Sequence, residues 1–139
     1  MRPTFQYNGN PVRACGIIFW TKIQGVRWNL LRHYKGKWQD IGGKTDVVDN
    51  NILSTATREV CEETNGELTP KKIRKLLKNG KTKKHYSLKS KYLLFSCHVE
   101  KKHTIPIDKF GTSEKGLPHK FKWFKTMPPL HYRLQHFRL

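Results

Sequence analysis

The most informative stretch of this chain is Arg58-Glu59-Val60-Cys61-Glu62-Glu63. If residues 52–64 form a helix, Glu59, Glu62 and Glu63 stand at positions i, i+3 and i+4, so three carboxylates share one surface. Like charges at this spacing destabilise a helix by roughly 0.2–0.5 kcal/mol per pair, and we expect a cation to neutralise them. Carboxylate oxygens are the ligands that Mg²⁺ and Mn²⁺ prefer, so the row is a candidate metal site. The alternative is an ordinary solvated acidic face.

The distribution of charge along the chain favours the metal site over the solvated face. The 139 residues include 28 Lys or Arg and only ten acidic residues, and the formal net charge is +18. Six of the ten acids nevertheless fall between positions 46 and 67: Asp46, Asp49, Glu59, Glu62, Glu63 and Glu67. The basic excess elsewhere predicts a polyanionic partner such as nucleic acid or polyphosphate.

Residues 43–66 resemble the Nudix box, G-x5-E-x7-R-E-U-x-E-E-x-G-U, where U is aliphatic. The core R-E-U-x-E-E matches in full over residues 58–63, and the required five residues separate Gly43 from an acid, Asp49. Eight residues rather than seven separate this acid from Arg58.

A second departure lies at the end of the box, where Asn65 takes the usual place of glycine and Gly66 follows one position late. Both residue types tolerate left-handed backbone, so either can end the helix. The box also loosely resembles that of the Nudix hydrolases of large DNA viruses, some of which remove mRNA caps.

The resemblance implies an α/β fold, a Nudix-type α/β/α sandwich with a mixed β-sheet, and Mg²⁺- or Mn²⁺-dependent hydrolysis of a phosphoanhydride. It implies that Glu62 and Glu63 bind metal, that Glu59 binds metal or acts as general base, and that the backbone carbonyl of Gly43 is a further ligand. Arg58 would orient carboxylates as a buried fork; the alternative is a surface base. A glutamate from the later loop would complete the metal site, and Glu114 is a better candidate than Glu100.

The net charge and the viral resemblance predict the class of substrate. Among the candidates, RNA 5′ ends, capped or triphosphorylated, rank first. The basic run over residues 71–84 predicts polyanion binding, with Lys81, Lys83 and Lys84 as substrate- or RNA-binding residues. Free nucleotides, dinucleoside polyphosphates and diphosphoinositol phosphates stay open. A non-catalytic basic RNA-binding protein on the same fold is the alternative from another class.

The apolar pattern predicts the remaining elements of one domain over residues 12–139, after an irregular segment at 1–11. Strands are expected at 12–20, 27–34, 38–41, 92–99 and 119–125, a basic helix at 71–78, a long loop at 104–118 and an amphipathic helix at 130–139. His131 and His136 are expected to have surface or capping roles.

Three widely spaced cysteines, Cys15, Cys61 and Cys97, indicate neither a disulfide framework nor a zinc site, so a reducing compartment is expected. No apolar stretch approaches membrane-spanning length. We therefore predict a cytoplasmic protein, in the host cytoplasm if it is viral, with no membrane partner.

Overall fold

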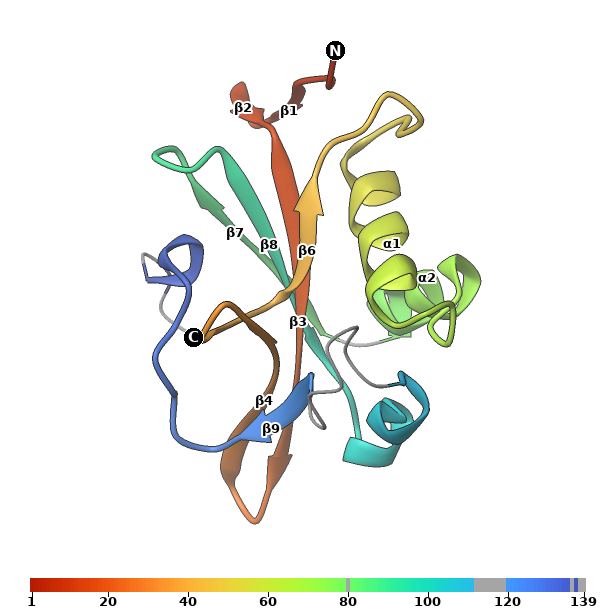
Figure 1. The fold of residues 1–139 in the computed structure, drawn as a ribbon, viewed down its shortest axis with the longest axis vertical. Helices are drawn as coiled ribbons and strands as arrows, with labels where there is room; N and C mark the ends of the chain where they lie inside the picture. The colour runs from red at the N-terminus through yellow and green to blue at the C-terminus, as the bar shows by residue number, and fades with distance from the viewer. Residues whose placement is uncertain (80, 112–119, 136, 138–139) are drawn as a thin grey trace.

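A mixed β-sheet built around strand β3 (Ala14–Ile23) forms the centre of the computed structural model, which describes residues 1–79, 81–111, 120–135 and 137. β3 pairs antiparallel with β4 (Val26–Tyr34) and β6 (Ile41–Lys44), and parallel with β8 (Tyr92–His98). Within the described residues the sheet has seven strands in the order β5-β4-β3-β8-β7, with β6 beside β3 and β9 beside β4 (Figure 1). The outer strands are β5 (Lys37–Gln39), β7 (Thr82–Ser87) and β9 (Phe121–Phe124).

β3 is buried on both of its faces, as its near-continuous apolar sequence predicts. Ile17 and Phe19 pack with one helix-covered core, whereas Ile18 packs with a second core on the opposite face of the sheet. The alternation follows from the two-residue period of a strand.

Two helices, α1 (Ile52–Glu63) and α2 (Pro70–Asn79), cover one face of the sheet (Figure 1). The side chain of Asn51 accepts a hydrogen bond from the Ser54 amide at 2.8 Å and so caps the start of α1. Asn65 (φ 53°) and Gly66 (φ 79°) both adopt left-handed backbone directly after its end. The predicted limits of both helices are confirmed to within a residue or two.

The predicted C-terminal amphipathic helix is wrong for the described part of residues 130–139. Leu130 forms an isolated parallel bridge with Trp38, and only a short 3-10 helix, η3 (Tyr132–Leu134), follows. Leu134 is fully buried in the second core, so this segment covers the sheet face that a helix was expected to cover. Tertiary contacts, and not helix propensity, set the conformation of this segment.

Two further regions differ from the sequence-based expectation. Residues 1–11 are not irregular throughout, because β1 (Phe5–Tyr7) and β2 (Asn10–Val12) form an antiparallel pair. The edge strand β7 was not predicted. The expected loop at 104–118 overlaps η1 (Lys102–Thr104) and contains η2 (Ile107–Lys109), and its residues 112–118 lie outside the described residues.

The fold class is therefore confirmed as mixed α/β with a mixed sheet, and β6 brings the Gly42-Gly43 pair alongside β3. Among the described residues, no helix is both long and apolar enough to span a membrane.

Candidate active site

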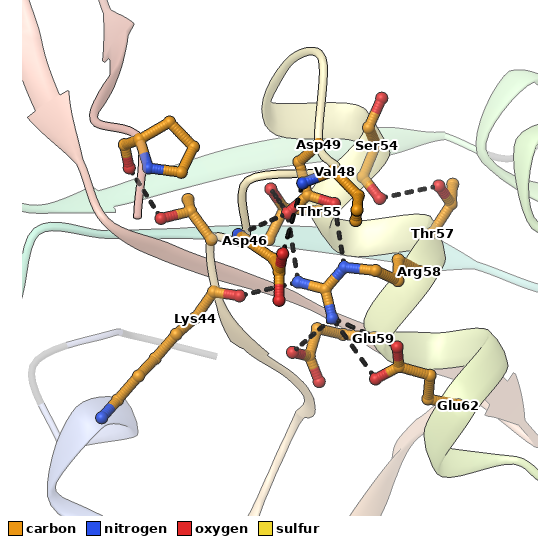
Figure 2. A network of polar contacts seen from close by, with 12 residues as sticks. Lys44, Asp46, Val48, Asp49, Ser54, Thr55, Thr57, Arg58, Glu59 and Glu62 are labelled. Atoms are coloured by element: carbon orange, nitrogen blue, oxygen red, sulfur yellow. Dashed lines mark hydrogen bonds and ion pairs between the residues drawn. The ribbon is translucent and has the colours of Figure 1, made fainter. Parts of the chain in front are cut away.

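Arg58 is the centre of a polar network at the start of α1, shown in Figure 2. Its Nε donates to Asp49 Oδ1 at 2.8 Å and its Nη2 donates to Asp49 Oδ2 at 3.1 Å, a bidentate pair. Nη2 also donates to the backbone carbonyl of Lys44, the last residue of β6, at 2.8 Å. Arg58 therefore has the fork geometry expected of it, and it ties the helix to the loop and strand that precede it.

The Asp49 carboxylate accepts hydrogen bonds from three residues, so its position is fixed and it anchors Arg58. Besides Arg58, its carboxylate accepts from the Thr55 hydroxyl at 2.7 Å and the Asp46 amide at 2.8 Å. Burial acts to raise the pKa of Asp49, but the hydrogen bonds from Arg58, Thr55 and Asp46 outweigh it and hold that pKa below its usual value. The acid of the box thus orients the arginine, a role that sequence reasoning left unassigned.

The third guanidinium nitrogen, Nη1, faces two of the three predicted carboxylates. It donates to Glu59 Oε1 at 3.1 Å and lies 3.3 Å from both carboxylate oxygens of Glu62. The Glu59 side chain is 14% exposed and the Glu62 side chain 58%. Burial raises the pKa of Glu59 and outweighs the opposing effect of Arg58. Glu59 is therefore the more enclosed of the two carboxylates.

Gly43 lies directly against the Glu59 carboxylate. A Cβ atom at position 43 would stand 2.5 Å from the carboxyl carbon of Glu59 and 2.6 Å from each of its oxygens. Only a residue without a side chain allows this approach. The structure thus brings together Gly43 and Glu59, as the resemblance implies.

Glu63 is turned toward two cations that sequence reasoning missed. Arg32 on β4 approaches its carboxylate to 2.6 Å, and Lys120, just before β9, approaches it to 3.3 Å. An arginine within the apolar run of a central strand was the available signal, since a buried charge needs a partner. Lys120 gave no such signal because it is one of 28 Lys or Arg spread along the chain.

A cleft of about 490 Å³, which we call the carboxylate cleft, opens beside these groups. Gly43, Glu59 and Glu63 line one part of it. Five cationic residues line it as well: Arg2, Arg13, Arg32, Lys44 and Arg133. Tyr34, His131 and Tyr132 add aromatic surface. Such a lining suits a ligand that carries both phosphates and a ring.

Two of these aromatic residues belong to the C-terminal segment, which a buried ion pair fixes in place. Arg133 Nε lies 2.9 Å from Asp40 Oδ1, and Arg133 Nη2 donates to the Asp40 carbonyl at 3.1 Å. Tyr92 donates its hydroxyl to the other oxygen of Asp40. Burial acts to lower the pKa of Arg133, but Asp40 outweighs it and raises that pKa.

His131 caps the start of η3 and also lines the cleft beside the carboxylates. Its Nδ1 accepts from the Arg133 amide at 3.3 Å, which confirms the capping role, and its presence in the cleft was missed. His136 and Glu114 lie outside the described residues.

The donors at this site fit Mg²⁺ or Mn²⁺ in kind, because they are hard oxygen ligands and the backbone of Gly43 lies against the Glu59 carboxylate. Glu62, however, lines the outer side of α1 with Arg58, whereas Glu59 and Glu63 face the cleft. Across the described residues, no three His, Cys, Asp or Glu side chains stand close enough together to form a ready-made metal site.

Lys81, Lys83 and Lys84 do not form one surface. Lys83 pairs with Ser96 and Lys84 with Phe95 on β8, so their side chains point to opposite faces of the sheet. Lys84 Nζ lies 6.0 Å from the rings of Tyr7 and Phe95, on the helix side. None of the three lines the carboxylate cleft.

No protein-family model matches the sequence, and no curated protein matches it. Two crystal structures of a C. elegans Ap4A hydrolase, one a binary complex, are similar at 20% identity over 81% of this chain and 78% of theirs, with TM-scores of 0.46 and 0.47. Shewanella oneidensis NrtR, complexed with a 27mer DNA, is similar at 17% identity and a TM-score of 0.47, over 88% of this chain and 57% of the NrtR chain.

Proposed function

We propose that this protein is a Nudix-type pyrophosphohydrolase that uses Mg²⁺ or Mn²⁺ to cleave a phosphoanhydride at the 5′ end of RNA, either a cap or a triphosphate. The observation that carries the proposal is the Arg58 network. One guanidinium holds Asp49, Glu59 and Glu62, and it does so where Gly43 lies against Glu59. An accidental acidic helix would not need an anchored arginine and a glycine at these two positions.

Glu63, with the backbone of Gly43, would hold the metal from the cleft side, and Glu62 would join it by leaving Arg58; Glu59 would bind the metal or act as the general base. When bound, the metal supplies charge neutralisation for phosphate oxygens and a water of lowered pKa. Glu114 stays a candidate for a further ligand.

Side chains of the protein would provide the proton acceptor and the contacts to phosphate and nucleobase. Glu59, whose pKa burial raises, is suited to accept a proton from the attacking water. Arg32 and Lys44 line the cleft beside the carboxylates and would bind phosphate oxygens. Tyr34 and Tyr132, which are 39% and 65% exposed, offer ring faces for a nucleobase.

The choice of RNA over a small nucleotide comes from the net charge of +18, which is far more than a few phosphates need. Lys81, Lys83 and Lys84 were predicted to contact RNA, and the positions of Lys83 and Lys84 on opposite faces divide that task between two surfaces. Dinucleoside polyphosphates, free nucleotides and diphosphoinositol phosphates are the competing substrates.

A substrate panel tests the proposal. Purified protein is incubated with capped RNA, 5′-triphosphorylated RNA, nucleoside triphosphates, a dinucleoside polyphosphate and a diphosphoinositol phosphate, each with Mg²⁺, Mn²⁺ or chelator. We expect product release from an RNA 5′ end with either metal and none with chelator. Turnover of only a small substrate would replace RNA by that substrate, and RNA binding without any hydrolysis would favour the non-catalytic alternative.

A further inference from the structure

A second, larger hollow of about 760 Å³ lies between α2 and the end of β8. Four lysines from three separate elements line it: Lys22 at the end of β3, Lys72 and Lys75 on α2, and Lys81 just before β7. We call it the lysine cleft. None of its lining residues lines the carboxylate cleft described above.

The gathering of these lysines follows from the register of α2. Lys72 and Lys75 stand at i and i+3, so they share one helix face, and Asn79 continues that face into the hollow. The other basic residues of α2 belong to the outer face: Lys71, Arg74 and Lys78. The backbone carbonyl of Lys81 accepts the His98 amide at 3.4 Å, which fixes Lys81 at the mouth of the same hollow.

Within the part of the chain that the structure describes, the lysine cleft carries an excess of positive charge. Among the described residues, none of its four lysines forms an ion pair. Glu100 is the single acid among the described residues that line it, and its backbone carbonyl accepts from the Thr21 hydroxyl at 3.2 Å. Four cations against one anion in a concave site raise the local concentration of a polyanion.

Aromatic residues form one wall of the lysine cleft. Trp20 and His98 line it, with their ring centroids 4.5 Å apart. The guanidinium of Arg27 lies 4.3 Å from the Trp20 ring centroid, and it is held there by Asn29 at 2.9 Å and Ser96 at 3.3 Å. Proteins that bind single-stranded nucleic acid without sequence preference combine a basic groove with aromatic side chains.

We propose that the lysine cleft binds the phosphodiester backbone of single-stranded RNA, downstream of the 5′ end that occupies the carboxylate cleft. This inference rests on the proposed function for its substrate, and it moves the predicted RNA contact away from Lys83 and Lys84. Lys81 stays in the contact set and is joined by Lys22, Lys72 and Lys75. A nucleotide bound in the carboxylate cleft alone contacts none of these lysines.

Binding of a 20-nucleotide single-stranded RNA across a salt series tests the inference. The cleft variant is Lys72→Gln/Lys75→Gln/Lys81→Gln, and the matched control is Lys71→Gln/Arg74→Gln/Lys78→Gln, which removes the same charge from the outer face of the same helix. Each single-strand phosphate contact contributes about −0.7 to the slope of log K against log salt. We expect the cleft variant to flatten this slope by about two and the control to change it by less than half as much. Equal slopes in the two variants would overturn the inference.

Steady-state kinetics separate this inference from the proposed function. In the cleft variant, KM for the 20-nucleotide RNA should rise by about tenfold or more at low salt, while kcat and the hydrolysis of a cap dinucleotide stay unchanged. An equal loss on the dinucleotide would contradict the inference. If the wild type hydrolyses neither substrate, the proposed function fails, and the salt series still decides whether the lysine cleft binds RNA.

Discussion

At the scale of single residues, Arg58 depends on its shape as well as its charge. It makes two parallel bonds to Asp49 and reaches Glu59 with its third nitrogen, and a lysine ammonium cannot reproduce this fork. We expect Arg58→Lys to lower kcat by about 10- to 100-fold, a range typical of residues that orient ligands. We also expect it to destabilise the fold by about 2 kcal/mol, because Asp49 loses a buried partner. Full activity in this variant would show that Arg58 is a surface base.

Glu59 is expected to set the acid side of the pH profile. Burial raises the pKa of Glu59, so the ionised carboxylate that can accept a proton forms at higher pH than the usual glutamic acid pKa of about 4.3 would allow. Activity should therefore rise with pH through an acid limb displaced upward from that value. Glu59→Gln should remove most of the activity and this limb with it. An acid limb of unchanged position in the residual activity of the variant would assign the proton transfer to another group.

At the scale of elements, the two glycines of β6 allow an effect on the position of the Glu59 side chain to be distinguished from an effect on strand packing. The three atoms nearest to a Cβ at Gly43 would be those of the Glu59 carboxyl group, whereas a Cβ at Gly42 would meet the Cys15 carbonyl and the Gly16 Cα at 2.4 Å. We expect Gly43→Ala to keep stability within about 1 kcal/mol while activity falls, because Glu59 must move. Gly42→Ala should instead cost about 3 kcal/mol of stability.

Thermal unfolding and turnover, measured on both alanine variants, check this difference. Unchanged activity in Gly43→Ala would show that the contact between position 43 and Glu59 has no functional role.

Elements that are encoded locally could be predicted, and those that depend on distant contacts could not. The limits of α1 follow from the Asn51 cap and the left-handed Asn65-Gly66 end, all within the box. β7 was missed because Thr82–Ser87 is an edge strand whose exposed lysines hide its alternation. The C-terminal segment was misassigned because its apolar residues have helical spacing, whereas its conformation is set by Arg133.

The same contrast holds within the candidate site. The row of glutamates, Arg58 and Gly43 are readable from one continuous motif. Arg32 lies on β4 and Lys120 directly before β9, far away in sequence, and the pairing of these two strands brings both to Glu63. No local pattern contains that information.

At the scale of the whole molecule, one ion pair joins residues 93 positions apart and holds the C-terminal segment on the sheet. Arg133→Met should destabilise the protein by about 3–5 kcal/mol, because it leaves the fully buried Asp40 charged and unpaired. Denaturant unfolding measures this loss, and adding Asp40→Asn should recover part of it. A double variant no more stable than the single one would show that the Asp40 charge is not the cause.

The most direct test of the central claim, metal-dependent hydrolysis at the α1 carboxylates, compares Glu63→Gln with Glu67→Gln on 5′-triphosphorylated RNA in Mg²⁺. Both variants replace one carboxylate by an isosteric amide, but Glu63 lines the carboxylate cleft and Glu67 does not. We predict that Glu63→Gln lowers kcat by about 100-fold or more with the circular dichroism spectrum unchanged, because a charged ligand is lost. Glu67→Gln should retain wild-type turnover. Wild-type turnover in folded Glu63→Gln, or in wild-type protein treated with chelator, would contradict the account.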